Sequence, residues 1–311
     1  MKTALPCLLS LALATGACTD APEPGPPADD PAEVTQAVTT TAFTASYTGQ
    51  GSNATTCNTS FTITGQEPST TGTFPVFLYM VGTSETATNA SATAAVAAMA
   101  SRGFVAGTIA YASGAFGNCS QISGKARCIF NGASSTSALS VLCSRAKADC
   151  SKGVVVGGFS QGAVIATLAK NFDSRVQAAW GMGDGVIYSI FNLTSCMGNG
   201  NRTLPSSRLR AVDGEKDQFI GPTQNNVRSQ FLTLTGLSCG STATNCLQSN
   251  GSGWYIVQNA QVQDGSADHC YMRRSGDCGG SQNSLDANWQ SGTDVWELGA
   301  NLDWLKTFTT P

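Results

Sequence analysis

The sequence is poor in charge and has almost no histidine. Asp, Glu, Lys and Arg make up 12% of the residues, about half the usual share in globular proteins. Lys and Arg form no run, so we expect no nucleic-acid partner. His269 is the only histidine, and the 12 cysteines include no C-x-x-C motif. This pattern argues against the usual zinc sites, and no cofactor or metal is implied.

The N-terminal apolar run is too short to cross a bilayer. It covers residues 5–14, interrupted by Ser10 and preceded by one cation, Lys2. These features are typical of a secretory signal peptide, which we place at residues 1–17. The small residues before Cys18 resemble the lipobox of bacterial lipoproteins, in which the cysteine is lipidated. Thr15 departs from the aliphatic residue usual there, so plain cleavage after Ala17 is the alternative.

Residues 18–38 are rich in proline and acid and contain no large apolar cluster. Such a segment buries too little apolar surface to offset its ordering entropy, so we expect an extended tether. With a lipid on Cys18 it would hold a folded domain near a membrane; without one it would be an inconsequential tail. We therefore predict a secreted or cell-surface protein whose membrane contact is limited to that lipid, followed by one domain over residues 39–311.

The cysteine count fits export. Cys7 and Cys18 belong to the targeting segment, and the remaining ten, an even number, indicate disulfides. The sequence cannot determine their connectivity, but local spacing suggests a set. The expected pairs are Cys119–Cys128, Cys143–Cys150, Cys239–Cys246, Cys270–Cys278 and, by remainder, Cys57–Cys196.

Apolar runs that alternate with helical patterns predict an α/β domain with a largely parallel sheet flanked by helices. We expect edge strands over residues 41–48 and 60–64, and a loop from about residue 111 to residue 132. Helices are expected over residues 90–102, 134–148, 163–170, 222–235 and 293–308, and further strands over residues 74–81, 104–111, 154–156, 177–183, 209–213 and 254–258.

One motif lies where such a sheet carries its chemistry. The run Val154–Val156 predicts a strand buried on both faces, and Gly158-Phe159-Ser160-Gln161-Gly162 follows it as G-x-S-x-G before a helical segment. Strand, sharp turn and helix are the context of a nucleophile elbow, in which glycines give room for a strained serine. Ser160 is therefore the candidate nucleophile.

A serine nucleophile needs a base, and His269 is the only imidazole available. It follows the last expected strand, and the chain order Ser, Asp, His is that of α/β-hydrolases. Asp217, just past a strand end, is the preferred acid, while Asp184 and Asp213 are alternatives. Asp268 is too close in sequence to orient its neighbour easily.

These residues resemble the α/β-hydrolase superfamily over most of residues 39–311, and two segments resemble cutinases. Gly82-Thr83-Ser84-Glu85 is similar to the segment with their first oxyanion donor, and Gly158-Phe159-Ser160-Gln161-Gly162-Ala163 is similar to their G-Y-S-Q-G-A. The resemblance implies that Thr83 and Gln161 provide the backbone N–H groups, with the Thr83 hydroxyl as a further donor. No cysteine lies next to Asp217, and the histidine loop differs, so the subfamily stays open.

We therefore expect a serine esterase that acts through an acyl-enzyme on a small or polymeric ester, without a cofactor, as a monomer. Ser160 would attack, His269 would carry the proton and Asp217 would hold the imidazolium. A peptidase or thioesterase with the same triad is an alternative, as is a non-catalytic surface lipoprotein that uses the fold for binding. Trp180, Trp254 and Phe159 are expected to fill the core rather than line the site.

Overall fold

A computed structural model describes residues 38–52, 55–274, 278 and 283–310 of the chain. The expected signal peptide, Cys18 and all but the last residue of the expected tether lie outside these residues. Among the helices described, none combines the length and the hydrophobicity that a bilayer crossing requires.

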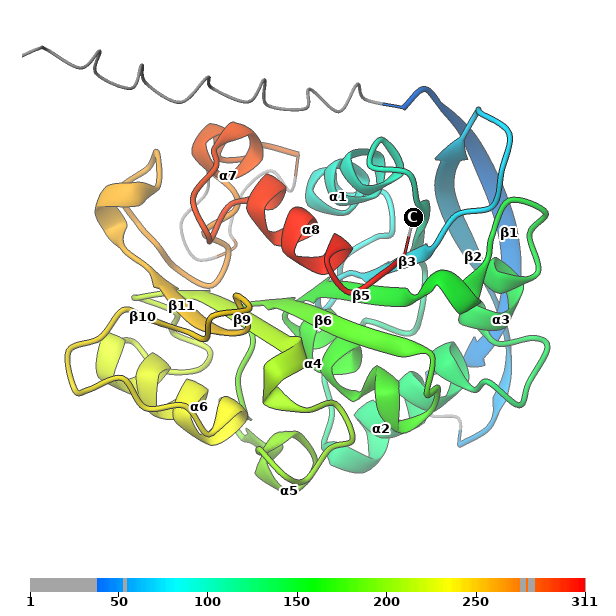
Figure 1. Cartoon of the computed structure of the whole chain (residues 1–311). Helices are drawn as coiled ribbons and strands as arrows, with labels where there is room; N and C mark the ends of the chain where they lie inside the picture. Colours follow the sequence, from blue (N-terminus) through cyan, green and yellow to red (C-terminus); the bar gives the residue numbers. More distant parts are fainter. Residues whose placement is uncertain (1–37, 53–54, 275–277, 279–282, 311) are drawn as a thin grey trace, which may run out of the picture. The chain divides into compact units, whose positions relative to one another are not determined.

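The described strands form a nine-stranded sheet in the order β1-β2-β4-β3-β5-β6-β9-β11-β10 (Figure 1). The six strands from β4 to β11 are mutually parallel, and β1, β2 and β10 add antiparallel pairings. This confirms the expected mostly parallel sheet. Its strands are β1 (Thr40–Gln50), β2 (Cys57–Pro68), β3 (Val76–Met80), β4 (Val105–Ile109), β5 (Val154–Phe159), β6 (Val176–Met182), β9 (Leu209–Gly214), β10 (Asn245–Leu247) and β11 (Gly253–Val257). A separate hairpin joins β7 (Ile187–Tyr188) to β8 (Phe191–Asn192).

Helices cover both faces of the sheet (Figure 1). One face carries α1 (Ala90–Ala100), α7 (Ala287–Ser291) and α8 (Leu298–Lys306). The other carries α2 (Cys119–Phe130), α3 (Ala138–Cys143), α4 (Gln161–Leu168), α5 (Thr194–Met197) and α6 (Gln224–Thr235). Single 3₁₀ turns lie at η1 (Cys150–Lys152), η2 (Ala169–Asn171), η3 (Ser206–Arg208) and η4 (Asn259–Gln261).

Strand β5 lies at the centre because its residues can be buried on both faces. Every residue of β5 and of the following helix α4 is buried. Gly157 leaves room for Trp180 of β6, since a Cβ there would lie 3.2 Å from the indole. Trp180, Trp254 and Phe159 are buried in the core, as expected, and Phe159 also lines a cavity.

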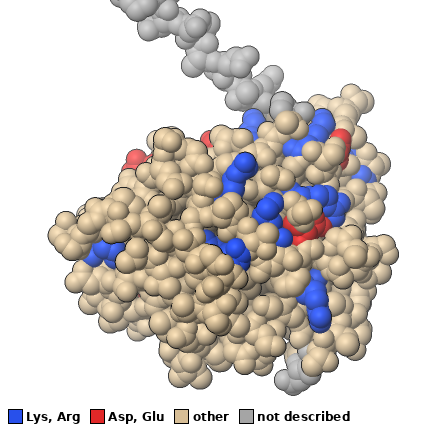
Figure 2. All heavy atoms as spheres, turned by 60° about the horizontal axis from the view of Figure 1, so that its bottom comes forward, with Lys and Arg blue, Asp and Glu red and all other residues tan. Residues whose placement is uncertain are grey.

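Charge is as sparse on the surface as in the sequence. On the face drawn in Figure 2, uncharged residues predominate, and Lys and Arg occur in small separate groups. Arg145 with Glu67 and Arg102 with Asp303 are ion pairs outside the site. The surface therefore relies on neutral polar side chains for its hydration.

Four element predictions were wrong. The expected loop before residue 132 contains helix α2, whose N-cap Asn118 and residue Gln121 form a capping box. This helix was missed because it is polar overall and buries only a stripe that includes Ile122, Ala126 and Ile129. The helix expected over residues 134–148 is limited to α3, and residues 293–297 precede α8 rather than belong to it. Strand β2 is not an edge strand, because β1 and β4 flank it.

Five disulfides join cysteines in the described part of the chain, and two of them differ from the expected pairs. Cys143–Cys150, Cys239–Cys246 and Cys270–Cys278 pair as expected. The structure instead joins Cys57 to Cys128 and Cys119 to Cys196. The prediction failed because Cys119 and Cys128 lie at opposite ends of α2. Nine residues of helix separate them by about 13 Å, beyond the reach of a disulfide. Five disulfides in one protein point to an extracellular or otherwise oxidising compartment.

The revised connectivity predicts unequal costs of removal. The Cys57–Cys128 bond closes a separation of 71 residues, and Cys143–Cys150 closes one of 7. From loop-closure entropy, the double substitution Cys57→Ser/Cys128→Ser should lower the free energy of unfolding by about 4 kcal/mol, against about 2.5 kcal/mol for Cys143→Ser/Cys150→Ser. Denaturant unfolding measures both. Mapping of a non-reduced digest supplies the control, and a peptide linking Cys119 to Cys128 would contradict the assignment.

Candidate active site

Ser160 occupies a strained turn between β5 and α4. Its φ is 54° and its ψ −119°, a backbone conformation that residues other than glycine rarely adopt. The turn is possible only because two glycines give it room. A Cβ on Gly158 would lie 2.4 Å from the backbone of Gly162, and one on Gly162 would lie 2.1 Å from the Met80 carbonyl oxygen. The close approach of α4 to β3 and β5 thus places Ser160 at the carboxyl end of the sheet.

Ser160 and His269 line the same cavity of about 270 Å³. Its wall is largely aromatic. The other lining residues are Thr83, Glu85, Phe116, Phe159, Tyr188, Ser189, Phe191, Phe219, Arg273 and Cys278. A larger hollow of about 570 Å³ lies over α2, but its lining, which is mostly Gln, Ser, Thr and Arg with one Gly and one Phe, includes neither an acid nor a histidine. The smaller cavity is therefore the one that carries reactive groups.

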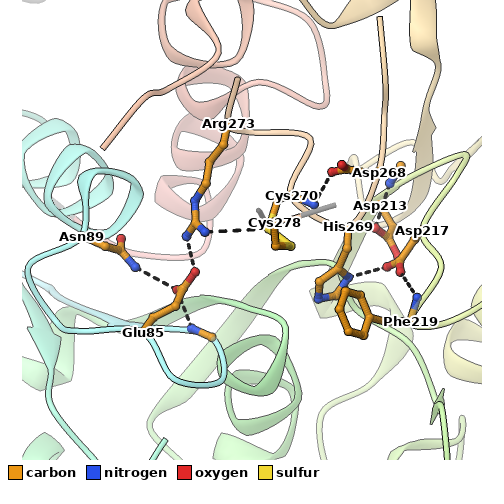
Figure 3. Close-up of a disulfide and its surroundings, with 12 residues drawn as sticks. Glu85, Asn89, Asp213, Asp217, Phe219, Asp268, His269, Cys270, Arg273 and Cys278 are labelled. Carbon is orange, nitrogen blue, oxygen red and sulfur yellow. Dashed lines mark hydrogen bonds and ion pairs between the residues drawn. A yellow bond between two sulfur atoms is a disulfide. The ribbon is translucent and has the colours of Figure 1, made fainter. Parts of the chain in front are cut away.

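The His269 side chain is held from several sides (Figure 3). Its Nδ1 is hydrogen-bonded to Oδ2 of Asp217, which follows β9. The rings of Phe159 and Phe219 lie 4.9 Å and 4.7 Å from the imidazole, centre to centre. Gly183 has a φ of 59°, and a Cβ there would lie 2.6 Å from His269 Cε1. The imidazole thus presents its Nε2 edge rather than its Nδ1 edge for other contacts.

Asp217 is built to remain ionised. Its Oδ1 accepts hydrogen bonds from the N–H groups of Phe219 at 2.6 Å and Ile220 at 3.2 Å. Burial alone would raise the pKa of Asp217, but the charge and hydrogen bond of His269, with the bonds from Asp213 and the Phe219 N–H, hold that pKa below its ordinary value. An ionised Asp217 favours the His269 tautomer with its proton on Nδ1.

Asp213 supports Asp217 from behind. Burial, and then the negative charge of Asp217, raise the pKa of Asp213 well above its ordinary value. Its Oδ1 accepts from the Gly214 N–H at 2.8 Å, while Oδ2 has no donor among the described residues. A protonated Oδ2 would instead donate to Asp217.

The ligand atoms of Asp213, Asp217 and His269 lie within 4.8 Å of one another, a spacing that a metal ion could use. The carboxylate oxygens of Asp217 are already occupied by hydrogen bonds, however, which favours proton sharing over metal binding.

The alternative acids face other groups. Asp184 is fully buried and accepts a hydrogen bond from the Thr167 hydroxyl at 3.0 Å. Asp268 accepts from the Cys270 N–H at 2.7 Å (Figure 3). Of the four acids considered from the sequence, Asp217 is the one whose carboxylate meets the Nδ1 of His269.

The two expected oxyanion donors also lie at this end of the sheet. Strands β3 and β5 are neighbours, so Thr83, after β3, comes close to Gln161, the first residue of α4. Their side chains are joined by a bond from Gln161 Nε2 to Thr83 Oγ1 of 3.1 Å. Within the described residues, the loop amides of Ser84 and Glu85 have backbone acceptors, but those of Thr83 and Gln161 have none. Free N–H groups, one of them at the start of α4, suit a developing negative charge.

A buried ion pair lies beside the cavity and was not predicted from the sequence. Arg273 contacts Glu85 through Nη2 and Oε1, and both side chains are almost completely buried (Figure 3). The other oxygen of Glu85 accepts from the Gly82 N–H and from Asn89 Nδ2, each at 2.8 Å. The pair therefore fastens the loop after β3 to the loop after His269. Its only signal in the sequence was the position of Glu85 in the expected oxyanion segment.

The disulfide Cys270–Cys278 begins at the residue that follows His269 (Figure 3). Cys270 is fully buried, and its N–H is bound by Asp268. Arg273 places its guanidinium 5.3 Å from the centre of the Phe159 ring. The chain on the C-terminal side of His269 is thus restrained by a covalent bond and by an ion pair.

No family model matches the chain, and no curated protein matches it. Among solved structures, part of the chain resembles the crystal structure of a hypothetical protein from Pseudomonas aeruginosa, at 15% sequence identity and a TM-score of 0.35. That match covers 51% of this chain and 46% of the other chain. The chain thus spans less than half of that protein, and the similarity carries no argument about activity.

The geometry predicts that substitutions of Asp217 and Asp184 affect kcat very differently. Asp217→Asn should lower kcat for a short p-nitrophenyl ester by about three to four orders of magnitude, because the amide would favour the wrong tautomer of His269. Asp184→Asn should leave kcat within about threefold, because its partner is Thr167. Steady-state kinetics on the two folded variants compares them. A larger loss in Asp184→Asn would transfer the acid to that position.

Asp184 should instead affect stability, in a pH-dependent way. Burial raises the pKa of Asp184 from 3.8 to about 6. The folded state therefore binds this proton more tightly than the unfolded state. Protonated Asp184 contributes stability below about pH 4, and this contribution is lost as the pH rises from about 4 to about 6. Asp184→Asn, which can still accept from Thr167, should be more stable than the parent by up to about 3 kcal/mol at pH 7. Urea unfolding at pH 4 and pH 7 tests this, and a stability difference that is equal at both pH values would contradict it.

Proposed function

We propose that this protein is a serine hydrolase with an α/β-hydrolase fold that cleaves carboxylic esters through an acyl-enzyme. One observation carries the proposal. A serine in a strained strand-to-helix turn shares a cavity with a buried histidine whose Nδ1 is bound to a buried carboxylate. The chain order Ser160, Asp217, His269 agrees with that fold, as does an oxyanion segment in the loop that follows β3.

In the first half-reaction, Ser160 Oγ would attack the ester carbonyl carbon while His269 Nε2 accepts the serine proton. Asp217 stabilises the imidazolium that forms and does not itself take the proton. The carbonyl oxygen becomes an oxyanion, which the Thr83 and Gln161 N–H groups would bind. Collapse of the intermediate expels the alcohol, which leaves with the proton from His269, and the acyl group remains on Ser160.

The second half-reaction repeats these steps with water. His269 would take a proton from water, whose oxygen attacks the acyl carbon, and the second tetrahedral oxyanion occupies the same donors. Its collapse releases the carboxylic acid and returns the proton to Ser160. In comparable hydrolases, each donor of the oxyanion hole lowers the activation barrier by about 3 kcal/mol.

The cavity favours an uncharged, apolar substrate group. Five of its lining residues are Phe or Tyr, and its two charged residues, Glu85 and Arg273, neutralise each other. Burial of a hydrocarbon group of the substrate against such a wall is favourable, and the wall offers no unpaired charge to bind an ionic group. Peptide bonds and thioesters would react by the same steps, and a substrate panel separates them.

The proposed location is outside the cytoplasm. Five disulfides require oxidising conditions. The N-terminal residues 1–17 would direct export, and lipid on Cys18 would anchor the protein through the proline-rich residues that follow.

The decisive test is covalent labelling combined with substitution. A fluorophosphonate probe should label the protein, and Ser160→Ala should abolish both labelling and ester hydrolysis. His269→Ala should lower both by several orders of magnitude, since the chain has no other imidazole. The double variant should be little worse than either single one, because the triad acts as a unit.

Ser120→Ala, on the exposed side of α2, is the matched control and should keep full labelling. Full activity of a folded His269→Ala variant would refute the triad. A wild-type protein that resists the probe and hydrolyses no ester would favour the non-catalytic alternative.

A further inference from the structure

Lys125 is a buried cation directly behind the candidate oxyanion hole. It lies on α2 with 9% of its surface exposed. Its Nζ donates to the carbonyl oxygens of Ala115 at 2.6 Å and Phe116 at 3.3 Å, and to Gln161 Oε1 at 2.8 Å. Among the described residues, no carboxylate forms an ion pair with it. A buried lysine without a counter-charge is costly and needs an explanation.

The contacts of Lys125 determine which way the Gln161 amide points. An ammonium group can only donate, so the Gln161 oxygen must face it and the amide NH₂ must face the other way. That NH₂ lies 3.1 Å from Thr83 Oγ1, 3.3 Å from the Ser113 carbonyl oxygen and 3.0 Å from the Ala115 carbonyl oxygen. The orientation of this fully buried amide follows from the chemistry of its neighbours.

The orientation of Gln161 in turn determines the role of the Thr83 hydroxyl. Its oxygen accepts a hydrogen from Gln161, so its own hydrogen must point elsewhere. Thr83 lines the cavity together with Ser160. The hydroxyl hydrogen is therefore free to be donated into the cavity.

We propose that Lys125 is a positioning residue of the oxyanion hole. It acts through Gln161 so that Thr83 offers both its N–H and its hydroxyl hydrogen to the oxyanion, and its uncompensated charge stabilises that oxyanion. This inference rests on the proposed hydrolase function. The charge is present before the reaction starts, so it favours the transition state without reorganisation.

Few other charges face this side of the hole. The helices α3 and α4 and the strand β1, which pack against α2, contain no Asp, Glu, Lys, Arg or His. Tyr47 on β1 and Tyr111 in the loop after β4 donate to backbone carbonyls, and burial raises the pKa of each above its ordinary value. Lys170 on η2 and Arg127 on α2 bind backbone carbonyls elsewhere. Across the cavity lie His269 and the neutralised pair of Glu85 and Arg273.

This setting makes the charge testable by pH. Burial lowers the pKa of Lys125 to about 8. As the pH rises through that value, the free enzyme loses the charge, but the neutral amine can still donate to Gln161. We therefore expect kcat/KM to fall above pH 8 to a lower plateau rather than to zero.

The test compares Lys125→Met, which has a similar length but no charge or donor, with Lys152→Met as the matched control. Lys152 binds the Thr73 carbonyl oxygen, remote from the cavity. Lys125→Met should lower kcat at pH 7 by about 10- to 100-fold with little change in KM. Its kcat/KM should stay level from pH 7 to pH 10, at or below the alkaline plateau of the parent because the donor to Gln161 is also lost, whereas Lys152→Met should keep the parent profile.

A cycle with Thr83→Val checks the route through the hydroxyl. If Lys125 acts through Thr83, the loss in kcat of Lys125→Met/Thr83→Val should be clearly smaller than the product of the two single losses. Thr83→Ser, which keeps the hydroxyl, should retain the full effect of Lys125. Losses that multiply would overturn the proposed route.

Outcomes against Lys125 are distinguishable from failure of the hydrolase proposal. If the wild type is not labelled by fluorophosphonate, the function itself fails. If it is labelled and active but folded Lys125→Met keeps its kcat, or keeps the alkaline fall, Lys125 has only a structural role. If Lys125→Met does not fold, the parent profile decides, because a level kcat/KM from pH 7 to pH 10 would overturn the inference.

Discussion

The constraint on which this structure depends is the strained backbone of Ser160. A φ of 54° is tolerated only where surrounding contacts hold it, and here they are the close approach of α4 to β3 and β5. That approach needs glycine at 158 and 162, and it needs fully buried elements on both sides of the turn. The apolar core thus supplies the free energy that holds one polar side chain in the cavity at the carboxyl end of the sheet, where an isolated turn would relax.

Around this turn, the buried polar groups support one another in a definite order. Asp213 contacts Asp217, Asp217 contacts His269, and on the opposite side Lys125 contacts Gln161, which contacts Thr83. Negative charge is thus placed behind the histidine and positive charge behind the candidate oxyanion hole. This polarity matches the charges that develop when a serine alkoxide attacks a carbonyl, with imidazolium on one side and oxyanion on the other.

Covalent and ionic links hold these groups together across distant parts of the chain. The Glu85–Arg273 pair joins the loop after β3 to the loop after His269, and Cys270–Cys278 restrains the same region. Cys57–Cys128 and Cys119–Cys196 attach both ends of α2, the helix that carries Lys125. Because surface ion pairs are few in the described part of this protein, the disulfides and the buried ion pair restrain loops that hydrogen bonds alone would hold less firmly.

The sequence by itself determined the features that depend on neighbouring residues. The apolar runs of β3 and β5, the glycines around Ser160 and the alternation of strands and helices predicted a mostly parallel sheet with a sharp turn at its centre. The tertiary structure alone decided which side chains meet. The polar helix α2 carried too weak a pattern to be recognised, so the disulfides at its ends and the position of Lys125 could not be inferred. Asp184 and Asp217 follow strands and Asp213 lies near the end of one, and only the path of the loop after β9 brings one of them to His269, because contacts between distant residues depend on how the strands are ordered in the sheet.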